Sequence, residues 1–492
     1  MQLTIFQQPM KVMKMSTKKR LGNWLIIAGL VVTVAGCKDL KLVTKTENNY
    51  TPASYQGSQD TLNSAKTQWN HFFKDPDLIT LIDTALKNNQ ELNIVMQEIT
   101  IAKAEVRAKK GEFLPSANLQ VGAGVDKVGR YTRNGALEAN NQIAPGKEFP
   151  EPMSDMIVGV NASWEIDIWR KLRNSRDAAA NRYLASVEGK NFMVTHLVSE
   201  IANSYYELIA LDNKLEILNQ TIDIQSNALQ IVKMQKIAGM VSELAVKKFE
   251  AEVLKNQSHV YYIRQSIVEA ENKINFLVGR FPQPVQRNSK NFTDLVPDTI
   301  YSGIPSQLLQ NRPDIRKAEL ELVATKFDLK AARADFYPSL RLTAGAGFNA
   351  FNVQYFIKAP QSLIYNIAGD LVAPLINRNA IKAKYFSANA KQIQAAYNYE
   401  KSILNGYIEV TNSLSMISNL KKSYDLKSQQ VQALTQSITI STNLFSNARA
   451  DYMEVLMTQR DAVESKFELI EMKQQQLSSW ISMYQALGGG WK

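Results

Sequence analysis

The chain contains an internal repeat, which limits the folds it can adopt. Residues 113–116 read Phe-Leu-Pro-Ser and return as Phe-Tyr-Pro-Ser at 336–339. A slightly shorter offset aligns 236–240 with 445–449. Two copies of one unit that differ by small insertions explain both alignments. The units are expected to span 68–292 and 293–492.

Each unit predicts the same succession of elements. A helix comes first, at about 76–111 in the first unit and about 313–336 in the second. Apolar residues then alternate with small or polar residues, which is typical of a strand with two different faces. A loop rich in turn residues at 129–152 leads to a return strand. We therefore expect β-hairpins at about 117–165 and 339–373.

A very long helix, a short turn and a shorter returning helix follow each hairpin. The long segments contain no proline, and each would extend ~100 Å at 1.5 Å per residue. Both carry apolar residues at spacings of three and four, as in a coiled coil. The expected long helix, turn and returning helix are 170–237, 238–242 and 243–278 in the first unit, and 377–446, 447–451 and 452–487 in the second.

The first residues indicate an export signal. Basic residues precede an apolar run at 24–34, which is too short to span a membrane as a stable helix. The following Val-Ala-Gly-Cys resembles a bacterial lipobox, in which the cysteine is acylated, although a chance cysteine after an ordinary signal peptide is the alternative. We expect a lipoprotein signal peptide at 1–36, a lipid anchor at Cys37 and a polar tether over 37–67.

Composition excludes several classes of function. One cysteine permits no internal disulfide, and three histidines are too few for a Cys/His zinc cluster. The net charge of +11 falls to +6 without the first 36 residues, which is modest for a nucleic-acid-binding protein of this length. No catalytic or phosphate-binding motif is visible. We expect neither an enzyme nor a cofactor.

Four strands per chain cannot close a membrane barrel, which needs at least eight. An open sheet in lipid would leave its edge groups unpaired, at several kcal/mol per group. Strands that span a membrane must therefore be pooled between chains, whereas a soluble sheet packed on a core is the alternative. In a pooled barrel, Asn118 and Gln120 would face water. The expected lipid-facing residues are Leu119, Val121, Val125, Leu342 and Phe348.

Several motifs together resemble one protein family. Residues 308–316 read Leu-Leu-Gln-Asn-Arg-Pro-Asp-Ile-Arg, and 331–340 read Ala-Ala-Arg-Ala-Asp-Phe-Tyr-Pro-Ser-Leu. Trp69 with Phe73, and Ala-Leu-Gly-Gly-Gly-Trp at 486–491, add to the pattern. The chain is similar to TolC-like outer-membrane efflux factors, and most similar to the lipoprotein branch that accompanies resistance-nodulation-division pumps. The resemblance runs from the lipobox cysteine to the last residue.

The resemblance implies an α+β membrane protein. Three chains would pool their strands into a transmembrane β-barrel and their helices into a periplasmic α-barrel, lipid-anchored in the bacterial outer membrane. This passive duct would dock to a periplasmic adaptor and an inner-membrane transporter, and would export small molecules without transforming them. Nucleic acid is not an expected partner. A structural coiled-coil lipoprotein without a lumen, or the duct of a secretion system, are the alternatives.

The resemblance also assigns roles to residues near the two helix turns. A gate lies just beyond the second turn, where Glu454 and Arg460 keep the family's charges and Met457 replaces a common aspartate. Three Glu454 carboxylates around an axis would attract cations; alternatively, Met453 and Met457 would form a dewetting plug instead. The alternative is a pair of solvated surface charges. The expected adaptor-docking tips are Ala238, Gly239, Met240, Val241 and Ser242, and Ala448, Arg449, Ala450 and Asp451.

Overall fold

The computed structural model describes residues 42–43, 45–55, 61–447 and 449–491. The chain divides into two compact units, 1–45 and 46–492, and the description that follows concerns the second unit by itself. The predicted signal peptide, the predicted anchor Cys37 and the tip residue Ala448 lie outside the described residues.

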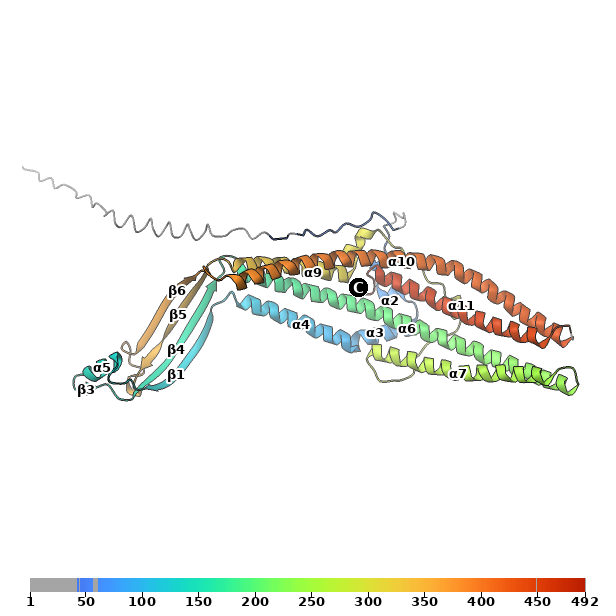
Figure 1. The fold of residues 1–492 in the computed structure, drawn as a ribbon, viewed down its shortest axis with the longest axis horizontal. Helices are drawn as coiled ribbons and strands as arrows, with labels where there is room; N and C mark the ends of the chain where they lie inside the picture. Colours follow the sequence, from blue (N-terminus) through green and yellow to red (C-terminus); the bar gives the residue numbers. More distant parts are fainter. Residues whose placement is uncertain (1–41, 44, 56–60, 448, 492) are drawn as a thin grey trace, which may run out of the picture. The chain divides into compact units, whose positions relative to one another are not determined.

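Two long helices dominate this unit, and each turns back into a shorter partner (Figure 1). In the first repeat α6 (Lys171–Ile237) is followed by α7 (Glu243–Val278), and in the second α10 (Asn379–Ser446) is followed by α11 (Tyr452–Ala486). These boundaries agree with the predicted ones to within two residues. The four strands lie at one end of the long helices and both turns lie at the other.

The helix that leads the first repeat is broken, and the predicted single helix over 76–111 is wrong. It consists of α3 (Pro76–Asn88) and α4 (Gln90–Gly111), whereas its counterpart α9 (Pro313–Ala334) is continuous. Asn89 causes the break. Its side-chain oxygen accepts from the backbone N–H of Leu92 at 2.8 Å and so caps α4, while its amide donates to a carbonyl of α7.

The sheet contains four antiparallel strands in the order β1-β4-β5-β6. They are β1 (Ser116–Asp126), β4 (Met153–Ile166), β5 (Ser339–Ala350) and β6 (Leu363–Val372). The strands at the start and end of both predicted hairpins are therefore present. The hairpin of the first repeat joins that of the second through the pairing of β4 with β5.

The register gives the sheet one apolar face and one polar face. Val121 lies opposite Val158, which lies opposite Phe348, so their side chains share a face. On the other face Asn161 donates to Gln120 across the β1–β4 pair at 2.7 Å. By the same register, all five residues predicted to face lipid lie on the apolar face: Leu119, Val121, Val125, Leu342 and Phe348.

The connection between β1 and β4 is more ordered than the predicted loop over 129–152. It contains α5 (Arg133–Asn140), which Thr132 caps, and a small hairpin of β2 (Gln142–Ala144) and β3 (Lys147–Glu148). The remaining short helices are η1 (Ser64–Lys66), α2 (Trp69–Phe72), η2 (Phe292–Asp294), η3 (Pro305–Gln307), α8 (Leu308–Asn311) and η4 (Val353–Tyr355).

The main apolar core lies halfway along the helices, where α2, α3, α6, α7 and α11 meet. Phe73, Ile201, Tyr205 and Tyr484 are almost completely buried there. The predicted seam of α6 runs through this core and continues to a smaller buried cluster near the turn. Among the helices in the described residues, none has the length and apolar character needed to cross a bilayer.

The segment that joins the two repeats is bound by both helical hairpins at this middle level. Arg287 forms ion pairs with Asp212 of α6 at 2.6 Å and with Glu271 of α7 at 2.5 Å. From the other hairpin, the buried Lys473 of α11 donates to the carbonyl of Leu295 at 2.9 Å. Burial lowers the pKa of Lys473. These contacts are called the linker clamp below.

Residues 46–55 pack against the second repeat rather than forming part of a free tether, and are called the N-terminal strap below. Glu47 forms an ion pair with Lys326 of α9 at 2.5 Å. Tyr55 is buried and its ring stacks on Tyr407 of α10 at 5.4 Å. The prediction of a polar tether over 37–67 is wrong for the strap, because the local composition does not reveal these distant partners.

Candidate gate and docking tips

The first turn has the conformation that its glycine predicts. Gly239 has a φ of +75°, a backbone conformation that costs glycine little. The N–H of Met240 donates to the carbonyl of Gln235 at 2.9 Å, which closes the end of α6. Ser242 then caps α7, since its hydroxyl accepts from the N–H of Ala245. The sequence therefore determines both sides of this turn.

The second turn closes with the same hydrogen bond. The N–H of Arg449 donates to the carbonyl of Leu444 at 2.8 Å, five residues back, as Met240 does in the first turn. The two bonds are related by the same offset that aligns 236–240 with 445–449 in the sequence. The closing bond is therefore present although the sequence has alanine at 448, the position that corresponds to Gly239.

Both tips open onto one cleft of about 360 Å³. Among the predicted tip residues, Ala238, Gly239 and Arg449 lie at the turns but do not line the cleft. A binding partner that enters it would contact both repeats of the chain at once. The lining residues are Gln235, Met240, Val241 and Ser242 from the first tip, and Phe445, Ala450, Asp451 and Tyr452 from the second.

A small apolar cluster beneath the cleft holds the two tips together. Phe249 and Val232 of the first hairpin are buried, and Phe445 and Tyr452 of the second pack against them. The amine of Lys248 lies 3.4 Å from the sulfur of Met453, which adds a polar contact between the hairpins. Displacement of one tip from the other must break these contacts.

The predicted gate residues lie on the exposed side of α11. Met453, Met457 and Arg460 share one face, because they are four and three residues apart. Glu454 lies beside that face, is exposed, and forms no ion pair within the described residues. Among the described residues, Arg460 forms an ion pair with the adjacent Asp461 at 3.3 Å. Within the described residues Met453 contacts Lys248, whereas Glu454 and Met457 are exposed and accessible to another molecule.

Polar residues also interrupt the seam near the gate. Gln225 of α6 accepts a hydrogen bond from the amide of Asn256 of α7 at 2.7 Å, and both side chains are buried. Gln459 of α11 is buried as well, and its Oε1 has no partner in the part of the chain described. Sequence analysis missed Asn256 and Gln459, although the polar Gln225 within an apolar seam was a signal.

The comparison with known proteins identifies the family. A family model described as "Outer membrane efflux protein" matches residues 81–280 and 304–489, one segment in each repeat. This chain belongs to the outer membrane efflux protein family. It is an outer-membrane efflux channel that extends into the periplasm, and its family consists of channels rather than enzymes.

Individual relatives of this efflux protein agree with the family. The cation efflux system protein CusC of Escherichia coli O6:H1 is 27% identical over 446 residues, covering 90% of this chain and 93% of CusC. The pyoverdine export outer membrane protein OpmQ of Pseudomonas aeruginosa is 26% identical over 425 residues, covering 86% and 88%. A crystal structure of CusC matches this chain with a TM-score of 0.80 and 24% sequence identity. The match covers 91% of this chain and 99% of the CusC chain.

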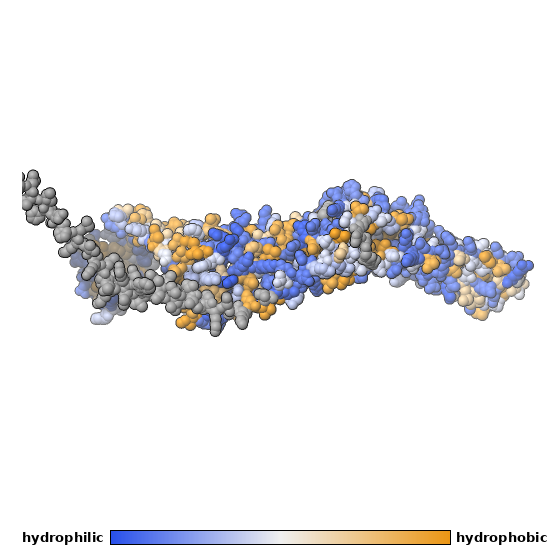
Figure 2. Space-filling view, turned by 90° about the horizontal axis from the view of Figure 1, so that it is seen from above, coloured by the Kyte–Doolittle hydropathy of each residue, from blue (hydrophilic) through white to orange (hydrophobic). Residues whose placement is uncertain are grey.

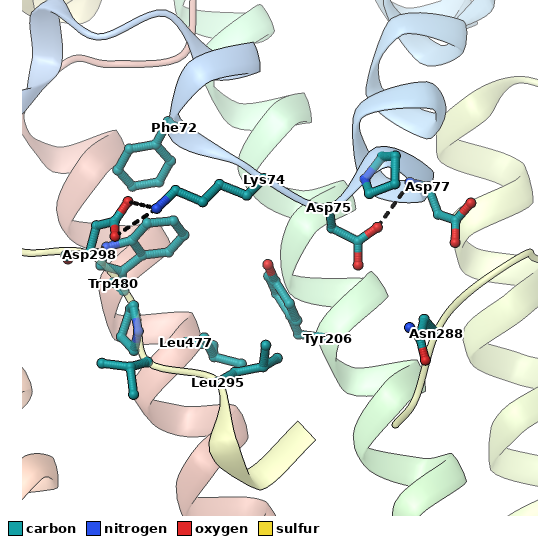
Figure 3. Close-up of a pocket in the computed structure, with 13 residues that line it drawn as sticks. Phe72, Lys74, Asp75, Asp77, Tyr206, Asn288, Leu295, Asp298, Leu477 and Trp480 are labelled. Carbon is teal, nitrogen blue, oxygen red and sulfur yellow. Dashed lines mark hydrogen bonds and ion pairs between the residues drawn. The ribbon is translucent and has the colours of Figure 1, made fainter. Parts of the chain in front are cut away.

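The efflux protein has another cavity, of about 400 Å³, beside the linker clamp (Figure 3). Lys74 and Asp298 form an ion pair at 2.7 Å, and the ring of Phe72 stacks on Trp480 at 3.9 Å. Tyr206 from α6 lines the other side. Sequence analysis did not identify this cavity, although Trp69 and Phe73, which belong to the family motif, lie in the neighbouring core.

Metal ligation finds little support in the described residues. No three His, Cys, Asp or Glu side chains are grouped there as a candidate metal site. The closest approach of a histidine to a carboxylate that the structure shows is 3.7 Å, from His196 to Glu200 one turn later on α6. These two residues alone do not form a metal centre.

Proposed function

We propose that this efflux protein forms a homotrimeric, passive duct for small molecules. Its tips would dock to a periplasmic adaptor, which links it to an inner-membrane transporter of the resistance-nodulation-division type. Cys37 would carry the lipid anchor. The observation that supports the assembly most strongly is a difference in burial between corresponding faces of the two repeats.

The leading helices differ in their neighbours. In the second repeat α9 packs between α6 and α10, and its residue Ala324 is completely buried. In the first repeat α4 packs on α6, and Ile101, the counterpart of Ala324, is 69% exposed. Ile94 lies on the same face and is also exposed. This apolar face of α4 lacks the partner that its counterpart has.

The long helices show the complementary difference. Leu404 of α10 is 58% exposed, whereas its counterpart in α6, Thr195, is 2% exposed. Tyr397 and Ile408 lie on the same face of α10 and are also exposed, whereas their counterparts in α6 are buried. The counterpart of Tyr397 is Glu188, which forms an ion pair with Arg316 of α9. The pairs of exposed and buried residues are Tyr397 with Glu188, Leu404 with Thr195, and Ile408 with Ser199.

The exposed face of α4 in one chain and the exposed face of α10 in a second chain would fit each other. The repeat predicts that α4 of one chain packs on α10 of the next chain, as α9 packs on α6 within the chain. Such a head-to-tail contact closes into a ring when the rotation permits. Three copies would combine twelve strands, enough for a closed barrel, and would pair the outer edges of β1 and β6. This sheet would present its apolar face to lipid.

A crosslinking experiment tests the assembly. Ile94→Cys combined with Tyr397→Cys, treated with a short bismaleimide in cells, should give covalent dimers and trimers and no larger species. Ile94→Cys with Ile440→Cys is the matched control, since Ile440 is an exposed apolar residue of α10 much closer to the turn. Absence of crosslinks with the first pair, or a ladder that continues beyond trimers, would contradict the proposal.

Ion conductance separates the duct from a structural coiled-coil spacer. The purified trimer should conduct ions in planar bilayers, and a protein that never conducts would favour the spacer. A photo-crosslinking amino acid at Met240 should capture an adaptor, because this residue is exposed and lines the cleft between the tips. Capture of an exported protein inside the duct would favour the secretion alternative.

The cargo is not fixed by the relatives. CusC is named for cation efflux and OpmQ for pyoverdine export, so similar chains serve different substrates. We therefore propose small molecules as a class. The predicted gate would select among them through its charge and through the apolar side chains of Met453 and Met457.

Charge removal tests the gate. Glu454→Gln would remove three carboxylates from a ring at the constriction and should lower the cation-over-anion permeability ratio by about twofold, because such rings attract cations. Glu269→Gln, an exposed carboxylate of α7 about 26 residues from the first turn, is the matched control and should leave the ratio unchanged. An unchanged ratio with Glu454→Gln would mean that Glu454 is a solvated surface charge. Arg460→Gln should shift the ratio in the opposite direction.

A further inference from the structure

The helices that lead into the two hairpins carry the same row of basic residues. On α4 the row consists of Lys103, Arg107 and Lys110, at spacings of four and three, so that all three lie on one face. The offset that aligns 113–116 with 336–339 places them on three cations of α9. The second row consists of Lys326, Lys330 and Arg333. The two rows are called the basic stripes below.

Most of this charge is not neutralised within the chain. Lys326 forms its ion pair with Glu47 of the N-terminal strap. The other five cations are exposed, and in the described residues none has a carboxylate oxygen within 4.0 Å. Like charges one turn apart on a helix repel each other. An anionic partner outside the chain would relieve this repulsion.

The stripes lie directly below the strands. They occupy the last ~10 Å of their helices, which end at Gly111 and Ala334, a few residues before β1 and β5 begin. Trp169 lies at the same junction, half-exposed, with its ring stacked on Tyr337 at 4.8 Å. Amphipathic aromatic side chains are enriched at membrane–water interfaces. This level therefore matches the headgroup layer of a bilayer that the strands cross.

The strap indicates which side of the wall the stripes face. Glu47 binds Lys326, and the chain leads from there back to the predicted lipid anchor. A lipid in the surrounding bilayer requires this segment to lie outside the tube. The stripe on α9 then faces outward, and the repeat places the stripe on α4 on the outer surface too. This step rests on the proposed assembly. Figure 2 shows polar patches interleaved with apolar ones along one face of the helices.

We propose that the basic stripes bind the phosphate headgroups of anionic phospholipids in the periplasmic leaflet. Both arginine and lysine suit phosphate, arginine through bidentate hydrogen bonds and lysine as a compact charge. Three chains would present six stripes around the duct, and these contacts would fix its depth and tilt in the membrane. Basic residues next to a membrane surface attract anionic lipid over a short distance only, which suits the position of the stripes.

Quenching of tryptophan fluorescence by brominated lipid measures this preference. The full-length trimer is reconstituted in vesicles that contain brominated phosphatidylglycerol or brominated phosphatidylcholine, and the reporters are Trp169 at the level of the stripes and Trp164 on the apolar face of the sheet. The wild-type protein should prefer phosphatidylglycerol roughly fivefold, as expected for a headgroup in contact with one cation. The variant R107Q/K110Q/K330Q/R333Q should prefer it less than about twofold. Added salt should weaken only the wild-type preference.

A charge-matched control and a functional readout complete the test. The variant K233Q/K273Q/K421Q/K422Q loses four exposed lysines far from the strands and should keep the wild-type preference. Equal quenching by both lipids in the wild-type protein, or an unchanged preference in the stripe variant, would overturn the proposal. Conductance of the same vesicles shows whether the protein has folded, and a conducting channel without lipid preference refutes this inference while leaving the duct intact.

Peptidoglycan is the competing anion. If the stripe variant keeps its preference for phosphatidylglycerol but no longer sediments with isolated sacculi, the stripes bind the cell wall and the lipid proposal is wrong. If the four substitutions together prevent assembly, the milder variant K110Q/R333Q is measured instead. These two residues lie nearest to the strands, so that this variant alone should lower the lipid preference measurably.

Discussion

The long helices α6 and α10 are counterparts in the repeat and nearly equal in length, but they are not equally covered. α6 has 67 residues, of which 23 are buried, whereas α10 has 68 residues, of which 10 are buried. α6 packs against α4, α7, α9 and α11, while α10 packs mainly against α9 and α11. The sequence pattern predicts both helices, and the helices packed against each of them determine how many of its residues are buried. In the proposed assembly, a second copy of the chain covers the exposed flank of α10.

The largest expected effect comes from a charge on that flank. Leu404→Asp should abolish the trimer, because the carboxylate would be buried without a partner against α4 of the next chain. The helical content should not change, since Leu404 has no role in the core of its own chain. Light scattering after detergent extraction measures the oligomer.

Met416→Asp is the matched control for that experiment. Met416 is similarly exposed on α10 but lies about a third of a turn away from the interface face. It should leave the trimer intact. A stable trimer with Leu404→Asp would mean that the missing neighbour of α10 is not another copy of this chain.

An intermediate effect is expected on the covered side of α10. The buried Arg312 forms ion pairs with Asp314 at 2.7 Å and with Glu409 of α10 at 2.5 Å, and donates to the carbonyl of Ala486. Arg312→Ala should lower the free energy of unfolding by about 2 kcal/mol, because the buried carbonyl of Ala486 loses its hydrogen-bond donor, while water can solvate the partly exposed carboxylates of Asp314 and Glu409. Arg460→Ala, which removes an exposed arginine, should change it by less than about 0.5 kcal/mol. Denaturant titration of both variants measures these free energies. Equal losses of stability in the two variants would contradict the prediction.

The smallest effect concerns the N-terminal strap, which packs on α10 through Tyr55. The hydrogen bond from Lys326 lowers the pKa of Glu47 below its ordinary value of 4.5. This contact therefore stabilises the docked strap above pH 4.5, and its contribution is lost as the pH falls through the lowered pKa. The protection factors of 46–55 against hydrogen exchange, which are corrected for the intrinsic pH dependence of exchange, should fall at acid pH by a change worth less than about 1 kcal/mol. Lys326→Gln should remove this pH dependence of the protection factors, and wild-type protection factors that are equal at all pH values would refute the role of Glu47.

Much of the fold was predictable because its signals are local. The absence of proline and the spacing of apolar residues determine α6 and α10, and strict alternation determines β1 and β5. The break at Asn89 was not predictable, since no proline or glycine interrupts that helix and the side chain of Asn89 is held by a carbonyl of α7. Tyr55 was missed for the same reason, because its partner Tyr407 lies far away in the sequence, in the second repeat.

The candidate site was predictable in its positions rather than in its contacts. The turn at Gly239 and the pairing of the two tips follow from the repeat and from the resemblance to the family. The contact of Lys248 with Met453 does not, because it depends on how the hairpins approach each other. In the proposed trimer the surroundings of Glu454 depend on other copies of the chain, so that the gate is a proposal that channel measurements must test.

The linker clamp holds the two helical hairpins near their middle, so that the parts of the helices between the clamp and the turns can tilt about it. Asp212, which binds Arg287 in the clamp, lies about 25 residues before the end of α6 at Ile237, or ~38 Å along the helix axis. A hairpin that pivots by about ten degrees at the clamp would thus move its tip by roughly 7 Å. Such a swing exceeds the reach of the small apolar cluster beneath the tips. A small rotation at the linker clamp is therefore sufficient to separate the two tips, while the main apolar core stays packed.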